Sequence, residues 1–142
     1  MAGRGPAPKG TLSRERDQAR RDALTLTVSV DGTVRGPDLP DVADWPSQTL
    51  AWWETWRRSP QSSTFTDTDW DFLIDTALLH ADYWTGNLAV AGELRLRAAK
   101  FGATPEDRQR LRLEVTGPDD KPAARPRSAA RRASLLKAVE SS

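Results

Sequence analysis

From residue 46 to residue 115, apolar side chains recur at intervals of three and four positions, the spacing that places them on one face of a helix. The first such face consists of Thr49, Trp52, Trp53 and Trp56. A longer and wider stripe starts at Trp70 and predicts a helix buried on more than one side. The pattern predicts a mainly α-helical fold with a compact core of about four helices, over residues 46–59, 68–85, 88–101 and 105–115.

A sharp corner is expected between the last two of these helices. Gly102 follows the apolar Phe101, at the position where a left-handed residue commonly ends a helix. Thr104 can cap the next helix together with Asp107, and Pro105 suits its first position because the N–H there has no helical partner. The stretch therefore predicts two basic helices joined by a short turn. Such a basic rim is typical of a nucleic-acid or acidic-partner surface, and equally of a solvated helix face.

Residues 24–30 alternate apolar and polar side chains, which is the period of a β-strand. Asp31-Gly32 follows as a hairpin-turn dipeptide, so a short β-hairpin is expected near residues 24–35. A two-stranded ribbon is marginally stable alone. This ribbon is therefore expected to pack on the helices or to pair with another subunit.

Charge divides the chain into an acidic centre and two basic ends. Residues 1–21 hold six Lys and Arg against two acids, residues 22–118 nine against fifteen, and residues 119–142 six against three. The N-terminal end also contains several Gly and Pro residues, which is typical of a disordered segment, and the C-terminal end is rich in Pro, Ala and Arg. We expect a basic flexible N-terminal arm over 1–22, a β-hairpin and linker over 23–43, a helical core that serves as oligomerisation domain over 44–116, and a basic C-terminal tail over 117–142.

The chain contains no cysteine, which excludes disulfides, a thiol nucleophile and cysteine-ligated metal. No apolar run approaches the length of a membrane span, and the basic N-terminus lacks the apolar segment of a secretory signal. A soluble intracellular protein is expected.

Four carboxylates form the most conspicuous cluster of titratable groups: Asp67, Asp69, Asp71 and Asp75. Alternating carboxylates resemble the start of a calcium loop, and paired carboxylates can hold the divalent metals of a nuclease. The glycine and the terminal glutamate of a calcium loop are absent, however. Acids in the first turn of a helix also complement its dipole, and this structural role fits the cluster better than a metal site.

The sequence contains neither a histidine motif nor a phosphate-binding loop that would indicate an enzyme. His80 is the only histidine and has no partner spacing that marks a metal site or a catalytic triad, so a place on a helix surface or an interface is expected. No phosphate-binding loop is present. Trp52, Trp53 and Trp56 could stack on bases, but at this spacing beside an apolar helix they are more typical of a core. No catalytic residue, metal or cofactor is predicted.

The sequence resembles the small terminase subunits of tailed phages that infect actinobacteria. The resemblance includes residues 2–9, 53–60 and 67–80, and it is strongest over Ala91-Gly-Glu-Leu-Arg-Leu-Arg-Ala-Ala-Lys-Phe-Gly-Ala-Thr-Pro-Glu-Asp-Arg-Gln-Arg-Leu-Arg112. It implies a non-enzymatic subunit of the DNA-packaging motor, acting in the host cytoplasm. Such subunits form ring-shaped homo-oligomers, bind the packaging site on double-stranded viral DNA, and regulate the large terminase subunit, which carries the ATPase and nuclease.

With that resemblance, three sets of residues become candidates. Cations repeated around a ring would bind DNA with a steep salt dependence. The expected DNA-binding residues are Arg4, Lys9, Arg14, Arg16, Arg20, Arg21, Arg108, Arg110 and Arg112. The residues expected to dock the large subunit are Arg125, Arg127, Arg131, Arg132 and Lys137. The residues expected at the oligomer interface are Trp53, Trp56, Trp70, Trp84 and Phe101.

Two other functions fit parts of the pattern. A dimeric DNA-binding transcriptional regulator would share the small size, the helices and the basic residues, and it would protect a short palindrome. A metal-dependent nuclease would use the four aspartates of residues 67–75, and Asp69→Ala would abolish its activity.

Overall fold

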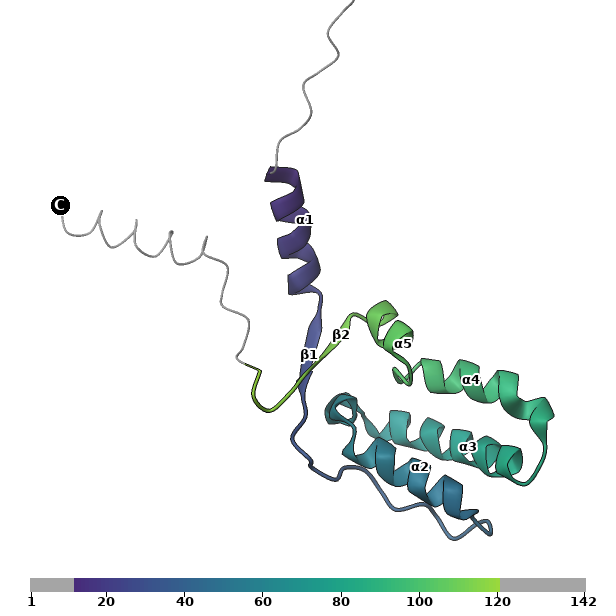
Figure 1. Cartoon of the computed structure of the whole chain (residues 1–142). Helices are drawn as coiled ribbons and strands as arrows, with labels where there is room; N and C mark the ends of the chain where they lie inside the picture. The colour runs from purple at the N-terminus through teal and green to yellow at the C-terminus, as the bar shows by residue number, and fades with distance from the viewer. Residues whose placement is uncertain (1–11, 121–142) are drawn as a thin grey trace, which may run out of the picture.

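The computed structural model describes residues 12–120, which form five α-helices, two short 3-10 helices and two strands (Figure 1). In chain order these are α1 (Leu12–Ala23), β1 (Leu26–Ser29), α2 (Ser47–Arg58), η1 (Pro60–Thr64), α3 (Asp67–Trp84), η2 (Leu88–Val90), α4 (Ala91–Ala99), α5 (Pro105–Arg110) and β2 (Leu113–Thr116). The mainly helical fold predicted from the sequence is confirmed.

Helices α2, α3 and α4 form the body of the protein, and α3 lies between the other two (Figure 1). Six buried side chains from these elements and the end of α4 make up its core: Trp53, Trp56, Trp70, Leu73, Ala77 and Phe101. The stripe that starts at Trp70 is therefore buried on two sides, as its width predicts.

Aromatic edge-to-face contacts connect the three helices. Trp53 of α2 meets Trp70 of α3 with ring centroids 5.7 Å apart, and Trp56 meets Phe101 at 6.1 Å. Phe65, between η1 and α3, lies 5.2 Å from Trp70 and 5.3 Å from Phe101. Such pairs contribute about 0.5–1.5 kcal/mol each beyond the area that they bury.

The segment before α2 is held against this core by donors from α2. The indole N–H of Trp53 donates to the carbonyl of Pro37 at 3.0 Å, and the Arg57 guanidinium donates to the carbonyl of Arg35 at 3.0 Å. Gly36 lies between these two contacts with a φ of 74°, and a Cβ there would fall 2.5 Å from the Trp70 ring. A residue without a side chain is required at this position.

The corner after Phe101 has the geometry that the sequence predicts. Gly102 has a φ of 78°, and Thr104 and Asp107 form a reciprocal capping box at the start of α5. The hydrogen bonds from Thr104 hold the pKa of Asp107 below its usual range. Asn87 likewise accepts from the amide of Ala89 at the start of η2.

Two expected elements differ from the structure in part. Residues 24–35 do not form a hairpin, because β1 pairs with β2 in a parallel two-stranded ribbon in which Leu26 aligns with Leu113. Asp31 instead pairs with Arg35 and accepts from the amide of Thr33 at 3.0 Å, and these contacts lower its pKa to about 2. The turn is thus stabilised by hydrogen bonds of the Asp31 side chain within residues 31–35, and no second hairpin strand follows it.

The helix expected over residues 105–115 begins at Pro105 as predicted, but it is shorter than expected, because α5 ends at Arg110 and β2 begins at Leu113. Arg112 lies between them with a φ of 54°, the left-handed region, which turns the chain out of the helix. Its carbonyl accepts from the amide of Leu26 at 2.9 Å. The partner strand is distant in the sequence, so the local helical spacing of Leu111 and Val115 does not reveal it.

The other helix boundaries agree closely with expectation, with one interruption. The helices expected over 46–59 and 68–85 are α2 and α3. The helix expected over 88–101 is divided into η2 and α4. The segment expected to be an N-terminal arm contains α1 in its described part, and α1 projects away from the helical body (Figure 1).

Gly36→Ala tests the packing of this segment on Trp70. The added Cβ clashes with the indole ring and the residue must hold a positive φ, so we expect a loss of about 2–4 kcal/mol in the free energy of unfolding. Gly32→Ala is the matched control, because Gly32 has a φ of 67° but nothing within 4 Å of an added Cβ. It should lose only about 1 kcal/mol. Urea unfolding followed by tryptophan fluorescence measures both, and equal losses would contradict the packing argument.

Candidate nucleic-acid interface

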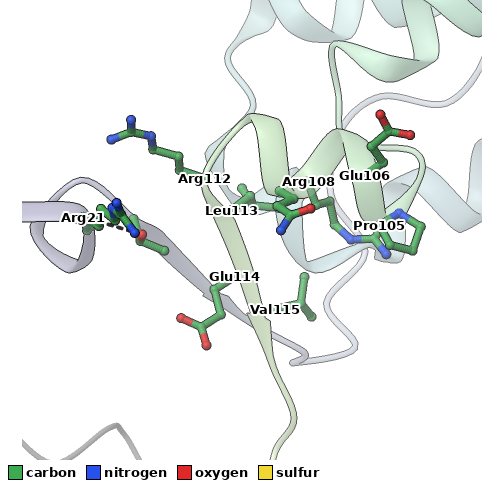
Figure 2. Close-up of a pocket in the computed structure, with 10 residues that line it drawn as sticks. Arg21, Pro105, Glu106, Arg108, Arg112, Leu113, Glu114 and Val115 are labelled. Atoms are coloured by element: carbon green, nitrogen blue, oxygen red, sulfur yellow. Dashed lines mark hydrogen bonds between the residues drawn. The ribbon is translucent and has the colours of Figure 1, made fainter. Parts of the chain in front are cut away.

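An open groove of about 940 Å³ lies where the end of α1, helix α5 and strand β2 meet (Figure 2). Its cationic side chains are Arg21 from α1, Arg108 from α5 and Arg112 from the turn before β2. Glu106 and Glu114 also line it, so the groove has a modest excess of positive charge.

The three arginines expected near the corner have different environments. Arg108 is half-buried and donates to the carbonyls of Gly102 and Ala103 at 3.0 and 3.3 Å, which fixes it against the corner. Arg110 pairs with Glu106 at 2.6 Å one turn away. Arg112 is exposed and has no ion pair among residues 12–120. Arg112 is therefore the cation of this set that is most available to a ligand.

Helix α1 carries four exposed arginines: Arg14, Arg16, Arg20 and Arg21. At 3.6 residues per turn they fall on one half of the helix, which they share with Asp17, while Glu15 and Asp22 lie on the opposite half. The helix has no apolar stripe along its described side chains, so it is not built to pack on an apolar core. The side of α1 that carries the arginines reaches the groove at its C-terminal end, where Arg21 is one of the lining residues.

Several expected residues lie outside the part of the chain that the structure describes. These are Arg4 and Lys9 of the DNA-binding set and the whole docking set, Arg125, Arg127, Arg131, Arg132 and Lys137.

Four of the five residues expected at an oligomer interface lie in the core of a single chain. Trp53, Trp56, Trp70 and Phe101 are each at most 8% exposed and pack against one another. Trp84 is different, because half of its surface is exposed at the end of α3. Helical spacing alone does not distinguish a core from an interface, and here the spacing reflects the core.

His80 is buried inside the chain and not on a helix surface. Its Nδ1 lies 2.9 Å from Oγ1 of Thr49, and its Nε2 accepts from the indole N–H of Trp84 at 3.2 Å. An indole only donates, so the imidazole proton is on Nδ1 and points to Thr49. Trp52 stacks on the ring with centroids 4.7 Å apart. The histidine thus joins α2 to α3 in its neutral form.

The four aspartates of residues 67–75 do not come together. Asp69 completes a capping box with Thr66 at the start of α3, as expected for acids in a first turn. Within residues 12–120, no three acidic or histidine side chains are placed to hold a metal ion. None of the described helices is long and apolar enough to cross a membrane.

A family model described as "Phage terminase small subunit" matches residues 3–140, nearly the whole chain. The chain belongs to the phage terminase small subunit family. Its function is therefore that of a small subunit in phage DNA packaging, and that family is generally non-catalytic. Comparisons with curated proteins and with solved structures found no match.

Sequence reasoning identified the arginines of this terminase subunit but not the groove between them. The lining residues that it missed are Thr25, three residues of α5 and three of β2: Pro105, Glu106, Gln109, Leu113, Glu114 and Val115. Thr25 terminates α1 through a hydrogen bond from its Oγ1 to the carbonyl of Arg21 at 2.9 Å. Residues 113–116 alternate apolar and polar side chains, a pattern that could have predicted the strand. The same residues also continue the helical spacing of the segment before them, and the helix was predicted instead.

The stability of the subunit should depend on the protonation of His80. Burial lowers the pKa of His80, so the folded state keeps it neutral while the unfolded state takes up a proton near the usual pKa, about 6.5. Stability is thus fully present above about pH 7 and is lost as the pH falls through the unfolded and then the folded pKa. We expect the free energy of unfolding of the wild type to decrease from about pH 7 to pH 5.

The control is His80→Gln, whose amide can still accept from Trp84 but does not titrate. Denaturant unfolding at several pH values should show a flatter profile for this variant over the same range. Identical pH profiles for the two proteins would contradict the role given to His80.

Proposed function

We propose that this small terminase subunit binds double-stranded viral DNA through the arginines of α1 and of the groove, and presents the packaging site to the large subunit as a ring-shaped homo-oligomer. The observation that carries the DNA-binding proposal is α1 itself, a projecting helix with four exposed arginines and no apolar stripe that leads to Arg112 in the groove.

Electrostatics favours a polyanion as the partner of this surface. A free helix of 12 residues is marginal in water, and α1 has no apolar side to gain stability by packing. Phosphate contacts release counterions and stabilise such a helix against DNA. Repetition of the same weak contacts around a ring raises the affinity without a strong contact in any one subunit.

The other roles that we propose are those expected of a small terminase subunit. The subunit acts in the host cytoplasm without a catalytic site or cofactor of its own, and it regulates the large subunit that carries the ATPase and nuclease. The basic C-terminal segment with Arg125, Arg127, Arg131, Arg132 and Lys137 docks that large subunit. We place the protein among the small subunits of actinobacterial phages on the strength of residues 91–112.

Replacing all four arginines of α1 with alanine tests the DNA-binding role of the helix. The slope of log K against log salt should become shallower by about 0.9 for each phosphate that a subunit no longer neutralises. Fluorescence anisotropy with labelled duplex DNA at several salt concentrations measures the slope. A variant that keeps the wild-type slope would remove α1 from the interface.

Arg112→Ala tests the groove by the same measurement, with Arg95→Ala as a matched control. Both arginines are exposed and lack an ion pair among residues 12–120, but Arg95 lines a different hollow beside His80. We expect Arg112→Ala to reduce the salt slope and Arg95→Ala to leave it unchanged. Equal slopes for the two variants would separate the groove from DNA binding.

Deletion of residues 119–142 tests the docking role. Co-purification with the large subunit should be lost because the cations of the tail are removed, while the salt slope for duplex DNA stays near that of the full chain. Undiminished co-purification would contradict docking through the tail, and a reduced slope would assign the tail to DNA instead.

A further inference from the structure

The ribbon of β1 and β2 carries an unusual share of the exposed apolar surface. Twelve large apolar side chains are exposed in the described chain, and half of them lie on the ribbon or within a few residues of it. These six are Leu24, Leu26, Val30, Val34, Leu111 and Val115. Exposed apolar side chains gathered near one element are typical of an interaction site.

The register of the strands gives the ribbon one apolar and one polar face. Leu26 aligns with Leu113 and Val28 with Val115, and side chains of aligned residues point to the same face. This apolar face is directed at η1, where Val28 is buried and where Leu26 and Leu113 line a hollow with Phe65 and Phe101. Leu26 and Val115 remain exposed, and Leu113 is half-buried. Parallel strands usually occur with both faces covered, so a half-exposed parallel pair is incomplete.

The outer edge of β1 is open for further pairing. The amides of Leu26 and Val30 donate to β2, to the carbonyls of Arg112 and Thr116. Because the backbone groups of successive residues point to opposite sides of a strand, those of Thr27 and Ser29 face the outer edge. Among residues 12–120, no other strand pairs there.

This edge lacks the features by which proteins prevent strand addition. Such edges usually carry a charged residue, a proline or a bulge, and residues 24–30 contain neither charge nor proline. The edge is thus unoccupied by any described strand, and its residues do not prevent another strand from pairing with it.

We propose that a second copy of this chain docks on the ribbon, adding a strand at the β1 edge and covering apolar side chains of the ribbon that the body leaves exposed. This inference rests on the proposed ring. The two outer edges of the ribbon belong to different strands, so contact between the β1 edge of one copy and the β2 edge of the next is head-to-tail. A head-to-tail contact can repeat from copy to copy. It closes into a ring when the rotation between neighbouring copies is a whole fraction of a full turn.

A second copy fits this surface better than other occupants. It supplies a β2 edge with which no third described strand pairs, bordering the groove beside α5, and apolar side chains of the same kind as those that it covers. The basic segment 121–142 and the large subunit are the alternatives, and the experiment below separates them.

Proline substitution at the outward amides tests the proposal. Thr27→Pro and Ser29→Pro remove a donor from the outer edge but leave the ladder to β2 intact. Thr27→Val and Ser29→Val are the matched controls, because they change the same side chains and keep the N–H. The near-ultraviolet circular dichroism of the tryptophan core, which lies away from these positions, verifies that each variant is folded.

Light scattering behind a sizing column measures the mass of the full-length chain over a range of concentrations. The wild type and both valine variants should form the same oligomer, and each proline variant should raise the dissociation constant of self-association by at least about tenfold. Hydrogen exchange should show that the amides of Thr27 and Ser29 become protected as the wild type assembles.

Three outcomes would overturn the proposal. A wild type that stays monomeric at about 100 µM would remove the second copy, since its dissociation constant would then exceed that of ordinary specific complexes. Proline variants with the wild-type mass would place the interface elsewhere. Protection of Thr27 and Ser29 in the monomer that disappears on deleting residues 121–142 would identify the tail as the occupant.

The same samples separate this proposal from the proposed function. If the proline variants keep the wild-type oligomer and the wild-type salt slope for DNA, the ribbon interface fails and the packaging role stands. If the wild type neither assembles nor binds duplex DNA, both fail.

Discussion

The contact of Phe65 with Trp70 and Phe101 is the interaction on which the rest of the structure depends. Phe101 is the last buried residue before the corner at Gly102, so its place in the core determines where α5 starts. Helix α5 in turn leads through Arg112 into β2, and β2 holds β1 and the base of α1. A body of three packed helices thereby positions a projecting basic helix through one aromatic cluster.

The local parts of this fold could be predicted from the sequence, and the parts that depend on distant segments could not. The helical stripe from Trp70 and the capping box of Thr104 and Asp107 depend on neighbours within a few residues, and both were predicted correctly. The ribbon joins residues 26–29 to residues 113–116, and no local spacing records that pairing. Arg112 was identified from the sequence as a candidate, but its left-handed conformation and the groove that it lines become visible only in the folded structure.

The arginines of the described chain serve two physical purposes. Arg57 pairs with Asp38 and Glu54 and donates to backbone carbonyls, and Arg97 pairs with Glu93 and lies over the Phe72 ring. These side chains contribute to the fold and have little charge left for a ligand. The sequence shows only that basic residues are abundant, whereas the structure separates those that are already paired from those, such as Arg112, that are not.

The ribbon also determines how force would pass through the molecule. Along the chain, helix α1 is connected to the body by residues 24–34, because α2 holds the backbone at Arg35 and Pro37. Hydrogen bonds from β1 to β2 provide a shorter connection from α1 to α5. Helices α1 and α5 both join the ribbon at the N-terminal ends of its parallel strands, so tension between them loads the ladder from that one end and opens its hydrogen bonds one after another, starting with Leu26 to Arg112. A load on α1 would therefore open the ribbon from the end at Leu26 before it reached the helical body.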